Sequence, residues 1–133
     1  MKMETYELEK QVHNALISDG ELMTLLPLGA LSIYHYFMPS SFTSKYPAVI
    51  YSPISDVPTL SGDNREMIHR VTIRIHVITA EQNTAAEQEK FLRVCRLVRD
   101  VMLRLQFRRQ QSTPYHEDGR AMLISDYVRG VES

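Results

Sequence analysis

Apolar and polar positions alternate most regularly in the segment MIHRVTIRIHVI, from Met67 to Ile78. Successive side chains of a strand point to opposite faces, so Val71 and Ile73 would share one face while Arg70 and Arg74 would share the other. The β-branched residues of the segment suit a pleated surface. The pattern therefore predicts a long strand with one nearly apolar face and one basic, polar face.

The N-terminal part shows helical spacing. Apolar residues recur every three or four positions from Glu4 to about Ile17, which predicts an amphipathic helix. Ser18-Asp19-Gly20 ends this helix, because glycine commonly follows a helix end and serine and aspartate favour turns. We expect Asp19 to cap a short helical turn, Glu21 to Leu26, which Pro27 closes.

The strongest helix prediction begins at Thr84. Thr84 and Glu87 have the spacing of a capping box, in which each side chain satisfies a backbone amide at the helix start. The apolar stripe that follows consists of Phe91, Val94, Cys95, Val98, Val101, Met102 and Leu105. We expect this helix to cover the apolar face of the long strand. Leu92 and Leu103 lie off the stripe, as flanking contacts or as a contact with another subunit.

Two strands are predicted before the long one, at Leu31–Tyr36 and Tyr46–Tyr51. The polar segment Ser55–Glu66 contains the turn signal Ser61-Gly62-Asp63-Asn64 and is expected to connect two strands, with an exposed, mobile loop at its tip. A strand, a turn-rich connection and a long alternating strand together predict an antiparallel hairpin.

The C-terminal part predicts a short strand at Phe107–Gln111, a polar loop at Ser112–Gly119 and a last strand at Ala121–Val131. Asp126 falls on the more apolar face of the last strand, and the sequence offers no reason for it. The expected fold is one α+β domain, residues 1–133. Its mixed, largely antiparallel sheet contains a long β-hairpin and packs against an N-terminal helix and one long central helix.

Composition narrows the function classes only slightly. The chain has 133 residues, a net charge of -1 and one cysteine, so neither a globally basic surface for nucleic acid nor an internal disulfide is expected. The N-terminus is too polar for a signal peptide, and no apolar run reaches the roughly 18 residues of a membrane span. We expect a protein made in the cytosol that does not enter a membrane.

Candidate chemistry is sparse. The five histidines show no metal-ligand spacing, and His69 and His76 would face opposite sides of the long strand. Glu117 and Asp118, which follow His116, could form a weak cation site, although an acidic loop is usually only solvated. Cys95 lies on an apolar helix face, where a thiol stays protonated. No catalytic residue, cofactor or metal is therefore predicted.

The basic residues are the better candidates for an interface. Arg104, Arg108 and Arg109 cluster where the central helix ends, and Arg70 and Arg74 project from one strand face. Arg104 could be present only because a positive charge at a helix C-terminus interacts favourably with the helix dipole. A functional interpretation is a basic surface for an acidic protein or for nucleic acid. We favour a protein partner, because a single nearby phenylalanine is too few aromatics for stacking on bases.

Four segments in order carry a family resemblance: YPAVIYSPIS, VTIRIHVIT, VRDVMLRLQFRR and STPYHEDGRAMLISDYVRG. With the helix that precedes them, this order resembles the tail-completion proteins of long-tailed bacteriophages, also called tail terminators or tail-to-head joining proteins. The resemblance spans roughly residues 4 to 131. The chain departs from the family in its polar connection at 55–66 and in the polar residues Ser125 and Asp126 of the final strand.

The resemblance implies a small α+β subunit that closes into a homo-oligomeric ring, a hexamer in the virion, from subunits that can be monomers when free. The ring would cap the tail tube, stop its polymerisation and present a surface to the head-completion or connector protein. This implies a protein of the virion, at the head–tail interface, made in the cytoplasm of a bacterial host. Alternatives are a head-completion or connector adaptor and a small nucleic-acid-binding α+β module.

A head-to-tail ring needs two different complementary faces on each subunit. The five arginines could provide one face, and the acidic first helix or Glu117 and Asp118 the other. Charge reversal at Arg70 and Arg74 would then disturb ring assembly.

Overall fold

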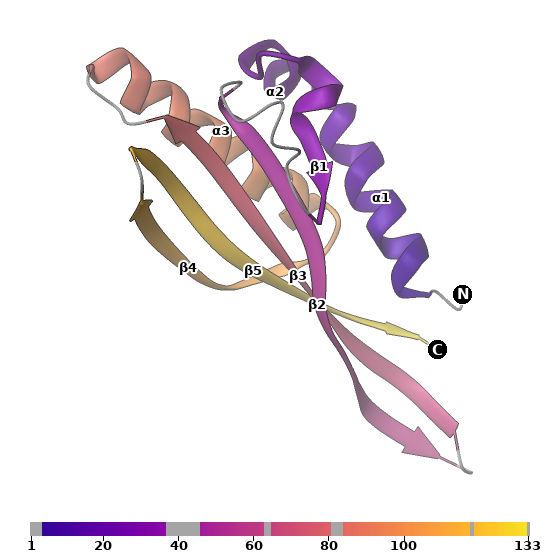
Figure 1. Ribbon diagram of the computed structural model, residues 1–133. Helices are drawn as coiled ribbons and strands as arrows, with labels where there is room; N and C mark the ends of the chain where they lie inside the picture. The colour runs from indigo at the N-terminus through magenta and orange to yellow at the C-terminus, as the bar shows by residue number, and fades with distance from the viewer. Residues whose placement is uncertain (1–3, 37–45, 63–64, 81–83, 118, 133) are drawn as a thin grey trace.

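The computed structural model describes residues 4–36, 46–62, 65–80, 84–117 and 119–132. One twisted five-stranded sheet forms its centre, with the strand order β1-β2-β3-β5-β4 (Figure 1). The strands are β1 (Ile33–His35), β2 (Ala48–Gly62), β3 (Arg65–Ala80), β4 (Arg108–Glu117) and β5 (Arg120–Glu132). Only β1 and β2 pair in parallel; the other three pairs are antiparallel. The predicted α+β class and the largely antiparallel sheet are confirmed.

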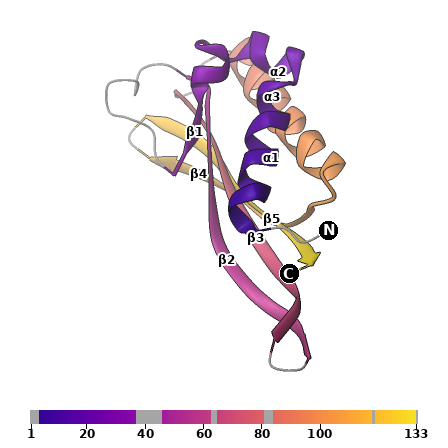
Figure 2. The same cartoon turned by 90° about the vertical axis from the view of Figure 1, so that its right-hand side faces the viewer.

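All helices lie on one face of the sheet, as Figures 1 and 2 show. They are α1 (Thr5–Ile17), α2 (Gly20–Leu25), the 3-10 turn η1 (Gly29–Ser32) and α3 (Ala85–Arg104). Asp19 caps α2 by accepting a hydrogen bond from the Leu22 amide at 2.9 Å, and Thr84 caps α3 by accepting one from the Glu87 amide at 3.1 Å. Both predicted N-caps are confirmed. No helix of the described segments is long and apolar enough to cross a bilayer.

The core lies between the helices and the apolar face of β3. Val71, Ile73 and Ile75 of β3 are at most 1% exposed, and the α3 stripe packs onto them as predicted. The buried α3 residues are Val94, Val98, Val101 and Met102. Leu92 and Leu103 stay exposed, so neither contributes to this core.

The predicted antiparallel hairpin is confirmed, but its connection is much shorter than Ser55–Glu66, because β2 continues to Gly62 and β3 already begins at Arg65. The pairing crosses both prolines of this stretch, with register shifts after Pro53 and Pro58. Such bulges accommodate extra residues without ending the strand, and proline is tolerated at bulges and edges. The connection at 63–64 lies outside the described residues.

Two other boundaries differ from the prediction. The expected loop at Ser112–Gly119 is strand up to Glu117, because the β4 backbone pairs with β5 through that whole stretch. An edge strand whose side chains stay in water needs no apolar alternation, so its sequence resembles a loop. The strand expected at Leu31–Tyr36 is shorter, because η1 occupies its beginning.

The distal half of the β2–β3 hairpin projects past the helices and the ends of the other strands (Figures 1 and 2). We call this projection, residues 54–62 of β2 and 65–70 of β3, the arm. Along the outer edge of β2, β1 is the one described strand that pairs with it, and β1 reaches only Val49–Tyr51. On the other side β5 accompanies β3 only as far as the pair between Ile68 and Glu132.

Candidate functional site: charged surfaces, grooves and the arm

Arg70 and Arg74 lie on the face of the sheet opposite the helices, as predicted, but their surroundings differ. Arg74 Nε donates to Asp126 Oδ1 at 2.8 Å, and its Nη2 donates to Asp126 Oδ2 at 3.1 Å. The amide of Gln111 donates to the same carboxylate at 2.9 Å. Arg74 is therefore neutralised by its own subunit, whereas Arg70 is exposed near the root of the arm.

The position of Asp126 is explained by this pair. The helix-covered face of β5 is the one that carries Tyr127 and Val131, so Asp126 and Val128 lie on the helix-free face beside Arg74. The Asp126 side chain is only 6% exposed. Its hydrogen bonds with Arg74 hold the pKa of the carboxyl below its ordinary value, against the opposing effect of burial. The pair therefore joins β3 to β5 within the subunit.

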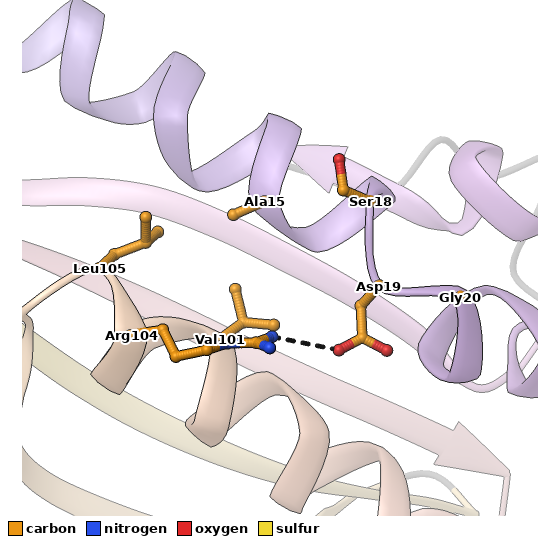
Figure 3. A pocket seen from close by; sticks show the side chains of 7 residues that line it. All are labelled: Ala15, Ser18, Asp19, Gly20, Val101, Arg104 and Leu105. Carbon is orange, nitrogen blue, oxygen red and sulfur yellow. Dashed lines mark hydrogen bonds and ion pairs between the residues drawn. The ribbon is translucent and has the colours of Figure 1, made fainter.

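Arg104 is also engaged within the subunit. Its Nη2 donates to Asp19 Oδ2 at 3.3 Å across the cleft between α1 and α3, as Figure 3 shows. The cleft has a volume of about 430 Å³ and is lined by small and apolar residues besides this pair. Because Asp19 also caps α2, Arg104 connects the end of α3 to the start of α2. This contact accounts for Arg104 without a partner protein.

The predicted arginine cluster is divided by the sheet. Arg108 pairs across strands with Val128, which places it on the helix-free face, whereas Arg109 pairs with Tyr127 on the helix side. Both side chains are exposed. Arg70 and Arg108 thus share one face, Arg109 lies on the other, and the five arginines do not form one basic patch.

Of the two predicted acidic residues, Glu117 lies at the opposite end of the sheet from the arm. Glu117 is the last residue of β4 and pairs with Arg120, while Asp118 lies outside the described residues. Next to this end a groove of about 250 Å³ runs between α3 and the β4–β5 pair. We call it the α3–β5 groove; its mainly apolar lining includes Phe91, Leu92, Cys95, Pro114, Met122 and Leu123.

The arm itself carries exposed apolar side chains. Ile54 is 44% exposed, Val57 43% and Ile68 36%. Val57 pairs with Arg70, and Ile68 lies two residues from Arg70, so Val57, Ile68 and Arg70 share the helix-free face. Polar and turn-forming residues follow Ile54, so the sequence alone does not reveal this surface.

A polar contact ties the root of the arm to α1. The hydroxyl of Thr5 donates to Asp56 Oδ2 at 2.5 Å, and His69 Nδ1 lies 2.5 Å from Asp56 Oδ1. Burial raises the pKa of the Asp56 carboxyl, but these hydrogen bonds outweigh it, so that the pKa lies below its ordinary value. Sequence reasoning placed His69 correctly on the helix-covered face, but it had no signal for the partner 13 residues away.

A second polar contact joins α1 to the sheet further along. The hydroxyl of Tyr51 lies 3.1 Å from His13 Nδ1, and the ring of His35 stacks on that of Tyr51 at 4.9 Å between centroids. His35 also contacts the carboxylate of Glu9. A crevice of about 320 Å³ lies beside these side chains. The histidines here serve packing between α1 and β1–β2.

Nothing in the described segments assembles a metal or nucleophile site. No group of three or more His, Cys, Asp or Glu residues in these segments is arranged to hold a metal ion. Burial raises the pKa of the Cys95 thiol to about 12, so the thiol is protonated at neutral pH, as the sequence predicts.

Comparison of the chain with models of known protein families and with curated proteins finds no match.

Proposed function

We propose that the chain is a structural subunit of a phage or prophage tail, a tail terminator that forms a ring on the tail tube and joins the tail to the head. The observation that supports this most is the arm, a paired strand extension that reaches past the helices and carries exposed apolar side chains. An element of this kind is suited to contacting another protein.

The order of elements also supports the proposal. The chain begins with a helix, α1, and continues to β2, whose start is the Pro-plus-aliphatic segment. The long strand β3 comes next, then α3, which ends before Phe107-Arg108-Arg109, and the final strand is β5. This is the order on which the resemblance to tail-completion proteins rests.

A nucleic-acid-binding module is less well supported. Arg74 and Arg104 already pair with Asp126 and Asp19, and Arg108 and Arg109 lie on opposite faces. Phosphate binding requires several free cations along one path. Of the five candidate arginines, this leaves Arg70 and Arg108 on a shared face.

Growth of tail tubes tests the function directly. Purified tail-tube protein is allowed to polymerise with increasing amounts of the chain, and tube lengths are measured by electron microscopy. A terminator shortens the tubes at amounts far below one chain per tube subunit, because it acts only at ends. Unchanged tube lengths, together with salt-sensitive retention of the chain on DNA, would contradict the proposal and favour the nucleic-acid module.

The two predicted interface arginines require different variants in such a test. Reversal at Arg74 would leave Asp126 without its partner and destabilise the subunit, so a loss of activity would be ambiguous. Arg70→Glu changes an exposed side chain and leaves that pair intact. It is therefore the cleaner test of whether the basic strand face takes part in assembly.

A further inference from the structure

We propose that the arm of one copy docks into the α3–β5 groove of a second copy, with Val57 and Ile68 as its apolar contacts. This head-to-tail contact rests on the proposed ring-forming function and specifies which surfaces meet.

The arm presents its apolar side chains together. Val57 and Ile68 are diagonal neighbours on the helix-free face, and Ile54 lies nearby in the bulge after Pro53. On the adjoining strand, Gly130 has no side chain to cover them, although a Cβ there would lie only 3.9 Å from Ile68 Cγ2. Each aliphatic side chain that becomes fully buried contributes about 1.5–3 kcal/mol. The arm thus has a substantial apolar surface left over for a contact.

The groove has matching chemistry and an appropriate size. Its lining is mainly aliphatic and aromatic, and Leu92 at its rim is 58% exposed. One water molecule has a share of about 30 Å³ in the liquid, so a volume of about 250 Å³ corresponds to roughly eight waters. One or two aliphatic side chains can displace that water.

A chain cannot fill its own groove with its own arm. On β3, Arg70 lies opposite Val57 of the arm. Thr79 of the same strand lies opposite Ala121, which lines the groove. The nine residue steps from Arg70 to Thr79 span about 30 Å at roughly 3.3 Å per residue. Figures 1 and 2 show the arm at the opposite end of the sheet from the end of β4, the start of β5 and the first turns of α3, which line the groove. The contact is therefore between copies and heterologous, the type that generates rings when it closes.

Charge complementarity supports a second copy as the occupant. Arg70 is exposed beside Val57 on the arm. At the groove, Glu89 is exposed on α3 next to Gln88, which lines the groove. An arginine that reaches a carboxylate at the rim of an apolar contact adds specificity and correct register.

The open edge of β2 argues for side-chain docking rather than strand addition. Pro53 and Pro58 remove two backbone donors, and the register shifts after both residues bend the strand. Prolines and bulges are the devices by which edge strands avoid pairing with other chains. The face of the arm, not its edge, is therefore the binding element.

Cross-linking of mixed single-cysteine chains tests the contact. Val57→Cys and Leu92→Cys are made separately in a Cys95→Ala background, because Cys95 itself lines the groove. Under mild oxidation at an assembling concentration, and again with tail tubes present, we expect a covalent dimer only when the two variants are mixed. As a control, Leu31→Cys, 71% exposed, should give no dimer with Leu92→Cys. Dimers from Val57→Cys alone would mean a symmetric contact and overturn the proposal.

A substitution without cysteine chemistry gives an independent result. We expect Val57→Asp to raise the concentration needed for assembly about tenfold, whereas Leu31→Asp leaves it within about twofold. If the unmodified chain assembles and terminates tubes but no mixed dimer forms and Val57→Asp has no effect, the docking proposal falls and the function stands. If mixed dimers form but tubes are unaffected, the docking stands and the terminator function falls. If neither is seen, both are wrong.

Discussion

The two halves of the β2–β3 hairpin consist of the same pair of strands but occupy opposite environments. In the body, Val49 and Tyr51 of β2 face Val77 and Ile75 of β3 under the helices, and all four are buried. In the arm the pairing continues past the helices, and Val57 is 43% exposed. The body is held together by buried side chains, whereas the arm leaves apolar side chains in contact with water.

The largest expected effect separates these halves by stability. Ile73→Ala removes a fully buried side chain between β3 and the helices, and we expect a loss of about 3 kcal/mol in the free energy of unfolding. Val57→Ala in the arm should change it by less than about 0.5 kcal/mol. Urea denaturation of both variants measures the contrast. Equal losses would mean that the arm packs against the body after all.

The next effect concerns the helix-free face of the body. Arg74→Met leaves the Asp126 carboxylate, 6% exposed, without its cation, and Gln111 as its remaining side-chain donor. Because Arg74 itself is 39% exposed and partly screened by water, we expect a loss of about 1–3 kcal/mol, below that of a fully buried pair. A matched change at the exposed Arg70, Arg70→Met, should cost less than about 0.5 kcal/mol. Thermal denaturation of the two variants distinguishes a paired arginine from a free one.

Acid should weaken the same contact. The folded state holds the pKa of Asp126 below its ordinary value of 3.8, so its stabilisation is fully present above that pH. It is lost as the pH falls through the lower pKa of the folded state. We expect Asp126→Asn to be about 1 kcal/mol less stable than the unmodified chain at pH 7 and the difference to shrink below about pH 4. A difference that grows toward acid would contradict the assigned direction.

The smallest effect concerns the root of the arm. Asp56→Asn weakens the contact with His69 and Thr5, and we expect amide hydrogen exchange in β3 residues 65–70 to become several times faster. Exchange at residues 71–77 should be unchanged, since those amides open only with the whole sheet. Uniform acceleration along β3 would show that arm and body open as one unit.

The sequence predicts the body of the sheet well and the arm poorly. Alternation in β3 and the stripe of α3 identify the core, because burial on one face leaves a periodic trace in sequence. The β2 side of the arm and β4 leave no such trace, because backbone pairing holds these strands and most of their described side chains are exposed. Pro53 and Pro58 are typical of a strand end, although bulges accommodate them within the strand.

The candidate site shows the same limit. The faces of Arg70 and Arg74 follow from strand periodicity, but the partner of Arg74 is 52 residues away and its identity depends on strand order. Likewise, the pairing of Arg104 with Asp19 joins residues 85 positions apart. Periodicity predicts the face on which a side chain lies. Only the tertiary structure shows whether a charged side chain on that face has an oppositely charged partner within the subunit.

The most direct test of the central claim is the solution mass of the chain by light scattering, at several concentrations, with and without purified tail tubes. A ring-forming terminator is expected to give a ring-sized particle, or a monomer that is captured at tube ends. A monomer at every concentration that ignores tubes would contradict the account.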